Sequence, residues 1–369
     1  MKAFSKILLL IVTAAFIPAG CDTDTSFKNP WKNLFDSKGR LLKRRDLHIE
    51  KGMEAWRIGN KQLALNELEA ALKIDDKHVD ALTTVGNIYR RDENYEKARE
   101  YYEKACKHGP REFSPHYNAG VTYQALAEYA KTLQKAQDFL REAVVKFRRS
   151  VLLSPESYDA HLNLGACYYL LDRPKSALQY FKKAHKLDPE DYKAVTNLGT
   201  LYDSLGQNKL AISFYKRTLE LNIDQPLVSV SLASVLIRMK KYSRAVSTLG
   251  QAIKRAPDNS RLHQELGLCY YQMRQLNKSL RAFQDAIRCD PENTAAYRGA
   301  GKVCMYQHLI TPKDKLYDYA MEAWKYSLQL DPTQDDLRKA IAKYSKLRNP
   351  PAASADSQTA PDRDSSINQ

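Results

Sequence analysis

The chain has 369 residues and a net charge of +15, with 27% charged residues but only 14 Gly, 15 Pro and 6 Cys. This length allows more than one globular domain. Long stretches rich in Ala, Leu, Lys, Glu and Tyr favour helices, and no run of alternating polar and apolar residues is long enough to indicate a sheet. The composition therefore predicts an all-α protein.

The amino-terminal segment has the layout of a secretory signal. Lys2 and Lys6 precede an apolar run from Ile7 to Ile17, and small residues follow before Cys21. We therefore predict that residues 1–20 form a signal peptide. Because the apolar run is much shorter than the roughly 20 residues that span a bilayer, we do not expect a retained transmembrane helix.

The sequence Ala19-Gly20-Cys21 resembles the lipobox of bacterial lipoproteins, with Pro18 where that family usually has Leu. The resemblance implies a lipid on Cys21 and a protein anchored in the bacterial cell envelope, facing the periplasm. It leaves open which membrane holds the anchor. The alternative is a secreted protein cleaved near Ala19, with Cys21 unmodified.

Residues 21–44 are interpreted as a lipidated basic tether. Eight Lys and Arg residues lie between Lys28 and Lys51, against three acidic residues. We hypothesise that the cluster Lys43-Arg44-Arg45 lies against anionic lipid, as juxtamembrane basic segments do. A nucleic-acid partner is not expected, because such binders interleave basic residues with aromatic stacking platforms.

A spacing of 34 residues runs through most of the chain. Small residues recur at this interval, with one gap of 45, at Gly52, Gly86, Gly120, Gly165, Gly199, Ala233, Gly267 and Gly301. A fixed period of this length indicates a stack of similar supersecondary units, each touching mainly its neighbours.

The unit from Tyr158 to Glu190 shows what each repeat contains. Apolar residues at helical spacing predict a first helix, the run Asp172-Arg173-Pro174 predicts a turn, and Ala177 and Phe181 lie on the inner face of a second helix. The small residues at Gly165 and Ala177 let the two helices approach closely, and Phe181 fills the space beside them. Pro189 ends the unit, since proline does not continue a helix.

The same columns recur in the other units. The second-helix small residue is Ala64, Ala98, Ala143, Ala177, Ala211, Ala245, Ser279 and Ala320. The large residue four positions later is Leu68, Tyr102, Phe147, Phe181, Tyr215, Leu249, Phe283 and Trp324. This set of columns resembles the tetratricopeptide repeat.

The resemblance implies a right-handed superhelical solenoid of eight helix-turn-helix units over residues 45–332, with longer third and eighth units. Extra residues around Ala127 to Gln137 are expected to lengthen the helices of the third unit into a projecting knob. Residues 333–348 are predicted to form the capping helix that a solenoid needs. Residues 349–369, rich in Pro, Ser, Ala and Asp, are predicted to be disordered.

No catalytic residue, metal site or cofactor is predicted. The cysteines have no CxxC spacing, the histidines show no metal-binding pattern, and neither a phosphate loop nor a nucleophile elbow is present. Cys167 and Cys269 stand two residues after a repeat glycine, where core packing is expected.

The predicted binding site is the concave face lined by first helices. Asn118, Asn163 and Asn197 each stand two residues before the repeat glycine in consecutive units, and a ladder of carboxamides can pair with an extended peptide backbone. Further candidates on this face are Tyr117, Tyr169, Lys193, Thr196 and Asp203. A two-lysine carboxylate clamp is not predicted, because the first unit has Ile49 and Met53 at the required positions.

These features predict a non-enzymatic adaptor that binds protein partners, as an extended peptide or a helix, at the membrane. An accessory subunit of an envelope enzyme or export system and a polyanion-binding protein remain alternatives. The candidate face carries both signs of charge, with Arg90, Arg91, Arg261 and Arg298 beside Asp80, Asp159, Asp203 and Glu265, and this mixture favours a peptide.

Overall fold

The computed structural model describes the backbone of residues 30–348 and the side chains of residues 37–346. Within this range every regular element is an α-helix, which confirms the predicted fold class. The predicted signal peptide, Cys21 and the predicted disordered tail lie outside the described residues. The chain divides after Pro110 into two compact units.

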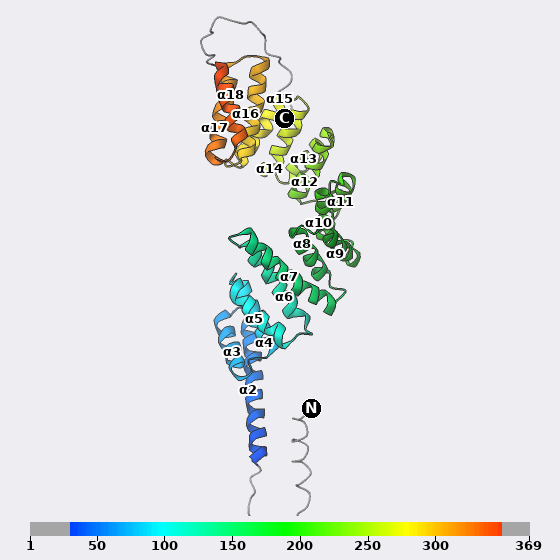
Figure 1. The fold of residues 1–369 in the computed structure, drawn as a ribbon, viewed down its shortest axis with the longest axis vertical. Coiled ribbons are helices and arrows are strands. Elements are labelled where there is room, and N and C mark those ends of the chain that lie inside the picture. Colours follow the sequence, from blue (N-terminus) through cyan, green and yellow to red (C-terminus); the bar gives the residue numbers. More distant parts are fainter. Residues whose placement is uncertain (1–29, 349–369) are drawn as a thin grey trace, which may run out of the picture. The chain divides into compact units, whose positions relative to one another are not determined.

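The first unit contains two helix pairs (Figure 1): α2 (Pro30–Arg57), α3 (Lys61–Ile74), α4 (Val79–Arg91) and α5 (Tyr95–His108). Helix α2 has 28 residues, whereas its partner α3 has 14. The first helix therefore begins at Pro30, so residues 30–44 of the predicted tether are helical. The core of this unit includes Leu68, Val85 and Ile88.

The second unit contains six helix pairs and a final single helix. The first three pairs are α6 (Phe113–Glu128), α7 (Leu133–Leu153), α8 (Tyr158–Leu170), α9 (Pro174–Leu187), α10 (Tyr192–Ser204) and α11 (Asn208–Leu221). The other helices are α12 (Pro226–Arg238), α13 (Tyr242–Arg255), α14 (Ser260–Gln272), α15 (Leu276–Cys289), α16 (Thr294–Ile310), α17 (Asp314–Leu330) and α18 (Asp335–Arg348). In each unit the helices of a pair pack on each other, and second helices also contact the next first helix.

The repeat glycines form close contacts between the two helices of a repeat. A Cβ added at Gly165 would lie 2.6 Å from Cδ1 of Phe181, and one at Gly86 would lie 2.6 Å from Cε1 of Tyr102. Real side-chain atoms do not approach this closely, so the large residue of the second helix occupies the volume that a side chain on the first helix would need. The packing role predicted for Gly165 and Phe181 is confirmed.

A left-handed residue ends the first helix of most repeats. Seven positions after the repeat glycine or alanine, a positive φ occurs at Gly59, Glu93, Asp172, Gly206, Lys240 and Arg274. In each case the next amide donates to a carbonyl five residues earlier, for example from Arg173 to Tyr168 at 2.8 Å. This is the Schellman arrangement, which satisfies the carbonyls that the helix end leaves unpaired.

The two longer repeats lengthen both of their helices. Helices α6 and α7 have 16 and 21 residues, against 13 and 14 in α8 and α9. Both α16 and α17 have 17 residues. At the connection between α6 and α7, Tyr129 and Leu133 are 66% and 76% exposed, so the extra turns extend beyond the packed part of the pair.

Helix α18 covers the end of the array as the predicted capping helix. Leu337 is buried, and the Gln334 side chain donates to the Ser327 and Asp331 carbonyls at the end of α17, at 3.0 and 3.1 Å. The Tyr317 hydroxyl donates to the backbone carbonyl of Tyr344 at 3.3 Å. These contacts hold α18 against the last repeat.

We predict that Gly165→Ala destabilises the protein by about 1–3 kcal/mol, since the new methyl group overpacks the contact with Phe181. The matched control is Gly250→Ala in the middle of α13, where an added Cβ meets nothing within 4 Å. That substitution should stabilise by about 0.5–1 kcal/mol, because alanine is the better helix former. Chemical denaturation followed by circular dichroism measures both, and equal effects of the two variants would contradict the close-packing account.

Candidate functional site

The first helices of successive repeats lie against each other and bring the predicted asparagines into one row. Helix α8 contacts both α6 and α10. Asn118, Asn163 and Asn197 are each half-buried on these three helices. The structure therefore places the three carboxamides in neighbouring repeats, as the spacing requires.

One of the carboxamides is used by the fold itself. The Asn163 Nδ2 donates to the Tyr117 hydroxyl at 3.1 Å, which links α8 to α6. Tyr117 in turn stacks on Phe113 and meets the Phe147 ring edge-on, with ring centroids 5.4 and 5.8 Å apart. Tyr117 is thus a packing residue whose hydroxyl holds the side chain of Asn163.

The carboxamide of Asn197 makes no hydrogen bond to any other side chain or backbone group among residues 37–346. Its donors and its acceptor are therefore available to a ligand. Lys193, one helical turn earlier on α10, is exposed. Asn197 and Lys193 therefore keep polar groups that the fold does not use.

Thr196 and Asp203 take part in interactions within the fold. The Thr196 hydroxyl donates to the Tyr192 carbonyl at 2.7 Å and lies 3.2 Å from the Thr218 hydroxyl of α11. Asp203 forms an ion pair with Arg238 at the end of α12. Both groups join helices, so a ligand would have to displace these partners to use them.

Tyr215 on the second helix α11 packs against the first helix α10 at Gly199. The Tyr215 ring fills the space above Gly199, where a Cβ would lie 2.9 Å from Cδ1 of the ring. Burial raises the pKa of Tyr215, whereas hydrogen bonds with Thr200 and Ser231 act in the opposite direction, and Tyr169 lies near enough to raise it slightly. Tyr169 itself is half-buried on α8.

Further along the array, the position two residues before the repeat glycine or alanine carries residues other than asparagine. The corresponding residues on α12, α14 and α16 are Ser231, Glu265 and Gly299. Burial raises the pKa of Glu265, while Arg261 and Gln264 partly oppose this shift. A carboxamide ladder therefore covers only α6 to α10.

Two histidines that follow no pattern of metal ligands have a structural role. Four residues before the repeat glycine, the Nε2 atoms of His161 and His263 lie 2.9 and 2.7 Å from the carbonyls of Pro155 and Pro257. Each buried ring satisfies a carbonyl in the loop before its own helix. We find no cluster of three potential metal-ligating residues among the described side chains.

The cysteines that the sequence assigned to the core are buried. Cys167 and Cys269 are completely inaccessible, and burial raises the pKa of each thiol to about 12. Such thiols are protonated and unreactive at neutral pH. Over the part of the chain that the structure describes, no helix is both long and apolar enough to cross a bilayer.

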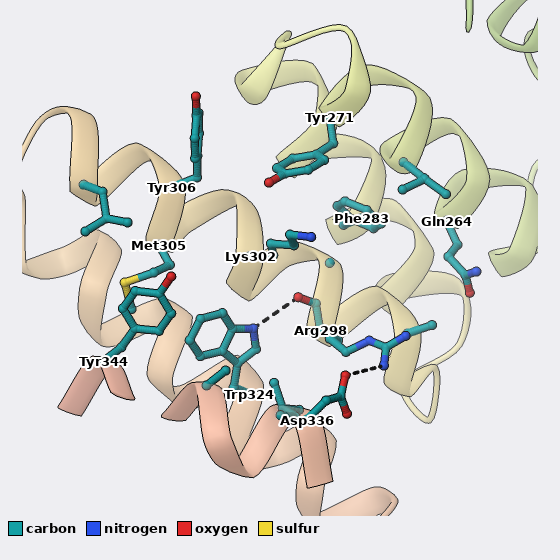
Figure 2. Close-up of a pocket in the computed structure, with 16 residues that line it drawn as sticks. Gln264, Tyr271, Phe283, Arg298, Lys302, Met305, Tyr306, Trp324, Asp336 and Tyr344 are labelled. Atoms are coloured by element: carbon teal, nitrogen blue, oxygen red, sulfur yellow. Dashed lines mark hydrogen bonds and ion pairs between the residues drawn. The ribbon is translucent and has the colours of Figure 1, made fainter. Parts of the chain in front are cut away.

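A cavity of about 520 Å³ lies in the carboxy-terminal repeats, away from the asparagine row. Its lining comes from α14, α15, α16, α17 and α18 and includes Tyr271, Phe283, Lys302, Trp324 and Tyr344 (Figure 2). Sequence reasoning missed this site. A signal was present in Gly299, which is a glycine at the position where other repeats carry a polar side chain.

The fold and the site together define the class of protein. It is an array of paired helices in which side chains of the first helices are available to a ligand. Four family models, each described as a tetratricopeptide repeat, match residues 49–114, 158–191, 192–222 and 236–302. The chain belongs to the tetratricopeptide repeat family. It is accordingly a protein-interaction scaffold, and its partners are proteins.

Three known proteins have distant similarity to this chain. The photosystem I assembly protein Ycf3 of Acaryochloris marina is 28% identical over 117 residues, covering 30% of this chain and 70% of that protein. A crystal structure of the C-terminal part of a repeat-containing protein from Cytophaga hutchinsonii has 18% identity and a TM-score of 0.54, covering 70% of this chain and 98% of that one. A repeat protein from Parabacteroides merdae has 16% identity and a TM-score of 0.51, covering 76% and 99%. The two structures show the shared fold.

We predict that Glu265→Gln raises the melting temperature at neutral pH. Because the pKa of Glu265 is raised in the folded protein, folding favours the protonated form, and its contribution to stability is lost as pH rises through that pKa. The gain should shrink as the pH falls below the pKa of an unfolded glutamate. Thermal unfolding from pH 4 to pH 8 measures it, with the exposed Glu220→Gln as control, and a gain independent of pH would contradict the prediction.

Proposed function

We propose that this protein is a non-enzymatic, membrane-anchored adaptor of the bacterial cell envelope, facing the periplasm. It holds a segment of a partner protein along the first helices of its middle repeats. The lipid on Cys21 and the basic part of α2 keep the array at the membrane. An assembly role is consistent with the similarity to Ycf3, which is itself named an assembly protein.

The proposal rests on Asn197, whose carboxamide lies in the row of first helices without an internal hydrogen bond. An extended peptide presents alternating N–H and C=O groups, and a carboxamide can accept from one and donate to the other. The exposed ammonium of Lys193 lies one turn away and suits an acidic side chain or a backbone carbonyl of the same segment.

Membrane attachment is supported by the amino-terminal part of α2. Leu41 and Leu42 are 52% and 38% exposed, and the adjacent Lys43 and Arg44 are also exposed. Exposed leucines beside cations can enter the interface of an anionic bilayer. Arg45 differs from its neighbours, because it bonds to Asp46 and Asp75 at 2.6 and 2.8 Å and is only 18% exposed.

The adaptor proposal predicts a partner that depends on the carboxamides. Affinity purification from solubilised membranes should recover a protein with the wild type, and Asn163→Ala with Asn197→Ala should weaken that interaction about tenfold or more, since each hydrogen bond contributes about 1 kcal/mol. Tyr117→Phe is the matched control. It removes the internal bond of Asn163 and leaves both carboxamides, so it should retain the partner. Equal recovery with the double variant would rule out the row as the binding site.

The membrane proposal predicts an electrostatic contribution in addition to the lipid. The comparison is made in a Cys21→Ser background, in which the protein carries no lipid. In that background, the double variant Lys43→Glu with Arg44→Glu should bind vesicles that contain anionic lipid about tenfold or more weakly, because each basic residue near such a surface contributes about 1 kcal/mol. Vesicle co-sedimentation at low and high salt measures this. Lys175→Glu with Lys182→Glu, two exposed residues of α9, is the control for net charge. Binding that ignores both salt and anionic lipid would refute the proposal.

A further inference from the structure

The carboxy-terminal cavity is formed where the array meets its capping helix. Helix α14 provides Tyr271, α16 provides Gly299 and Lys302, and α18 provides Tyr344. Phe283 and Trp324, the large residues of the last two second helices, contribute the rings that line its inner side (Figure 2). A volume of about 520 Å³ is within the usual size of ligand pockets.

Several residues that line the cavity are small. Gly299 lies so close to Phe283 that an added Cβ would be 2.5 Å from Cε1 and Cζ of the ring. Ala295 and Ala340 are also lining residues, on α16 and α18.

Aromatic rings surround the space and are fixed by contacts with each other. Tyr271 and Tyr306 meet edge-on, with ring centroids 6.3 Å apart, and Trp324 and Tyr344 are 5.7 Å apart. The indole Nε1 of Trp324 donates to the Arg298 carbonyl at 3.2 Å, so its polar atom is satisfied within the protein. These residues offer a ligand apolar ring surface together with the hydroxyls of the three tyrosines.

Lys302 lines the cavity without a carboxylate partner, and Arg274 lies outside the lining, beside one of the rings that form it. The Lys302 Nζ lies 5.3 Å from the centre of the Tyr271 ring, and the guanidinium of Arg274 lies 4.9 Å from that of Tyr306. Neither residue forms an ion pair within residues 37–346. Arg298 meets Asp336 at 3.6 Å, so the lining holds one carboxylate against two cations, with Arg274 as a third cation nearby. The border is therefore electropositive, and it complements an acidic ligand.

We propose that this cavity is a second binding site of the adaptor, which takes an acidic segment of a partner protein carrying one aromatic side chain. The aromatic side chain enters among the rings, and flanking carboxylates pair with Lys302 and Arg274. This assignment rests on the proposed adaptor function and adds the chemical class of the partner segment. The chain's own residues 349–369 match less well, since they contain three aspartates but no aromatic residue.

The test is fluorescence anisotropy with the full chain in detergent and a labelled nine-residue peptide in which Asp and Glu flank a central Phe on both sides. We expect saturable binding that weakens with salt. A peptide with Ala in place of Phe should bind at least about tenfold more weakly, because a buried aromatic side chain contributes about 1.5–3 kcal/mol. Equal binding of the two peptides would overturn the proposal.

Charge variants locate the binding. The double variant Lys302→Glu with Arg274→Glu should weaken binding of the Phe peptide about tenfold or more. The milder Lys302→Gln should weaken it by a smaller factor. Lys278→Glu is the matched control, because Lys278 is also exposed and lies 5.7 Å from the centre of a tyrosine ring, that of Tyr270, outside the cavity. If the control weakens binding as much as the double variant, the assignment to this cavity is wrong.

Two further variants test whether the peptide binds at the asparagines or whether the chain's own tail occupies the cavity. Asn163→Ala with Asn197→Ala should leave peptide binding unchanged, so that a failure of the asparagine row and a failure of the cavity are distinguishable. Deletion of residues 349–369 should also leave the affinity unchanged. If that deletion strengthens binding several-fold, the chain's own tail occupies the cavity, and the proposal of a partner segment is overturned.

Discussion

The contact between the repeat glycine and one large residue of the second helix is the constraint on which the rest of the structure depends. At Gly120, Gly165 and Gly267 an added Cβ would lie 2.6–2.9 Å from a phenylalanine ring. Because the first helix has no side chain there, the second helix can place a ring against its backbone. The repeats that carry this glycine therefore share the same kind of close contact between their two helices.

This constraint also determines which residues are left for function. Residues that pack between helices are unavailable to a ligand, whereas the three asparagines two positions before the glycine on α6, α8 and α10 remain partly exposed. Even there the fold uses some of them, as the bond from Asn163 to Tyr117 shows. The array then offers two chemically distinct surfaces, a carboxamide row in the middle repeats and an aromatic, cationic cavity at the capping helix.

Much of the architecture could be predicted from the spacing. The turn at Asp172, the role of Phe181 and the lengthening of the third pair of helices all follow from local sequence and agree with the structure. The roles of polar residues could not be predicted in the same way. Asp203 was a candidate for ligand binding but pairs with Arg238, which is 35 residues away in the sequence, and no local pattern reveals such a partner.

The sequence by itself determined the repeat, its helices and the small and large residues that pack, because helix periodicity and close packing act between residues near each other in the chain. Only the tertiary structure decided which polar groups remain free and where space is left. Asn197 and Asn163 are indistinguishable in the sequence, but only Asn163 meets a tyrosine of the preceding repeat. Likewise, the cavity beside Gly299 depends on rings from five helices, and its volume exists only after those helices have packed.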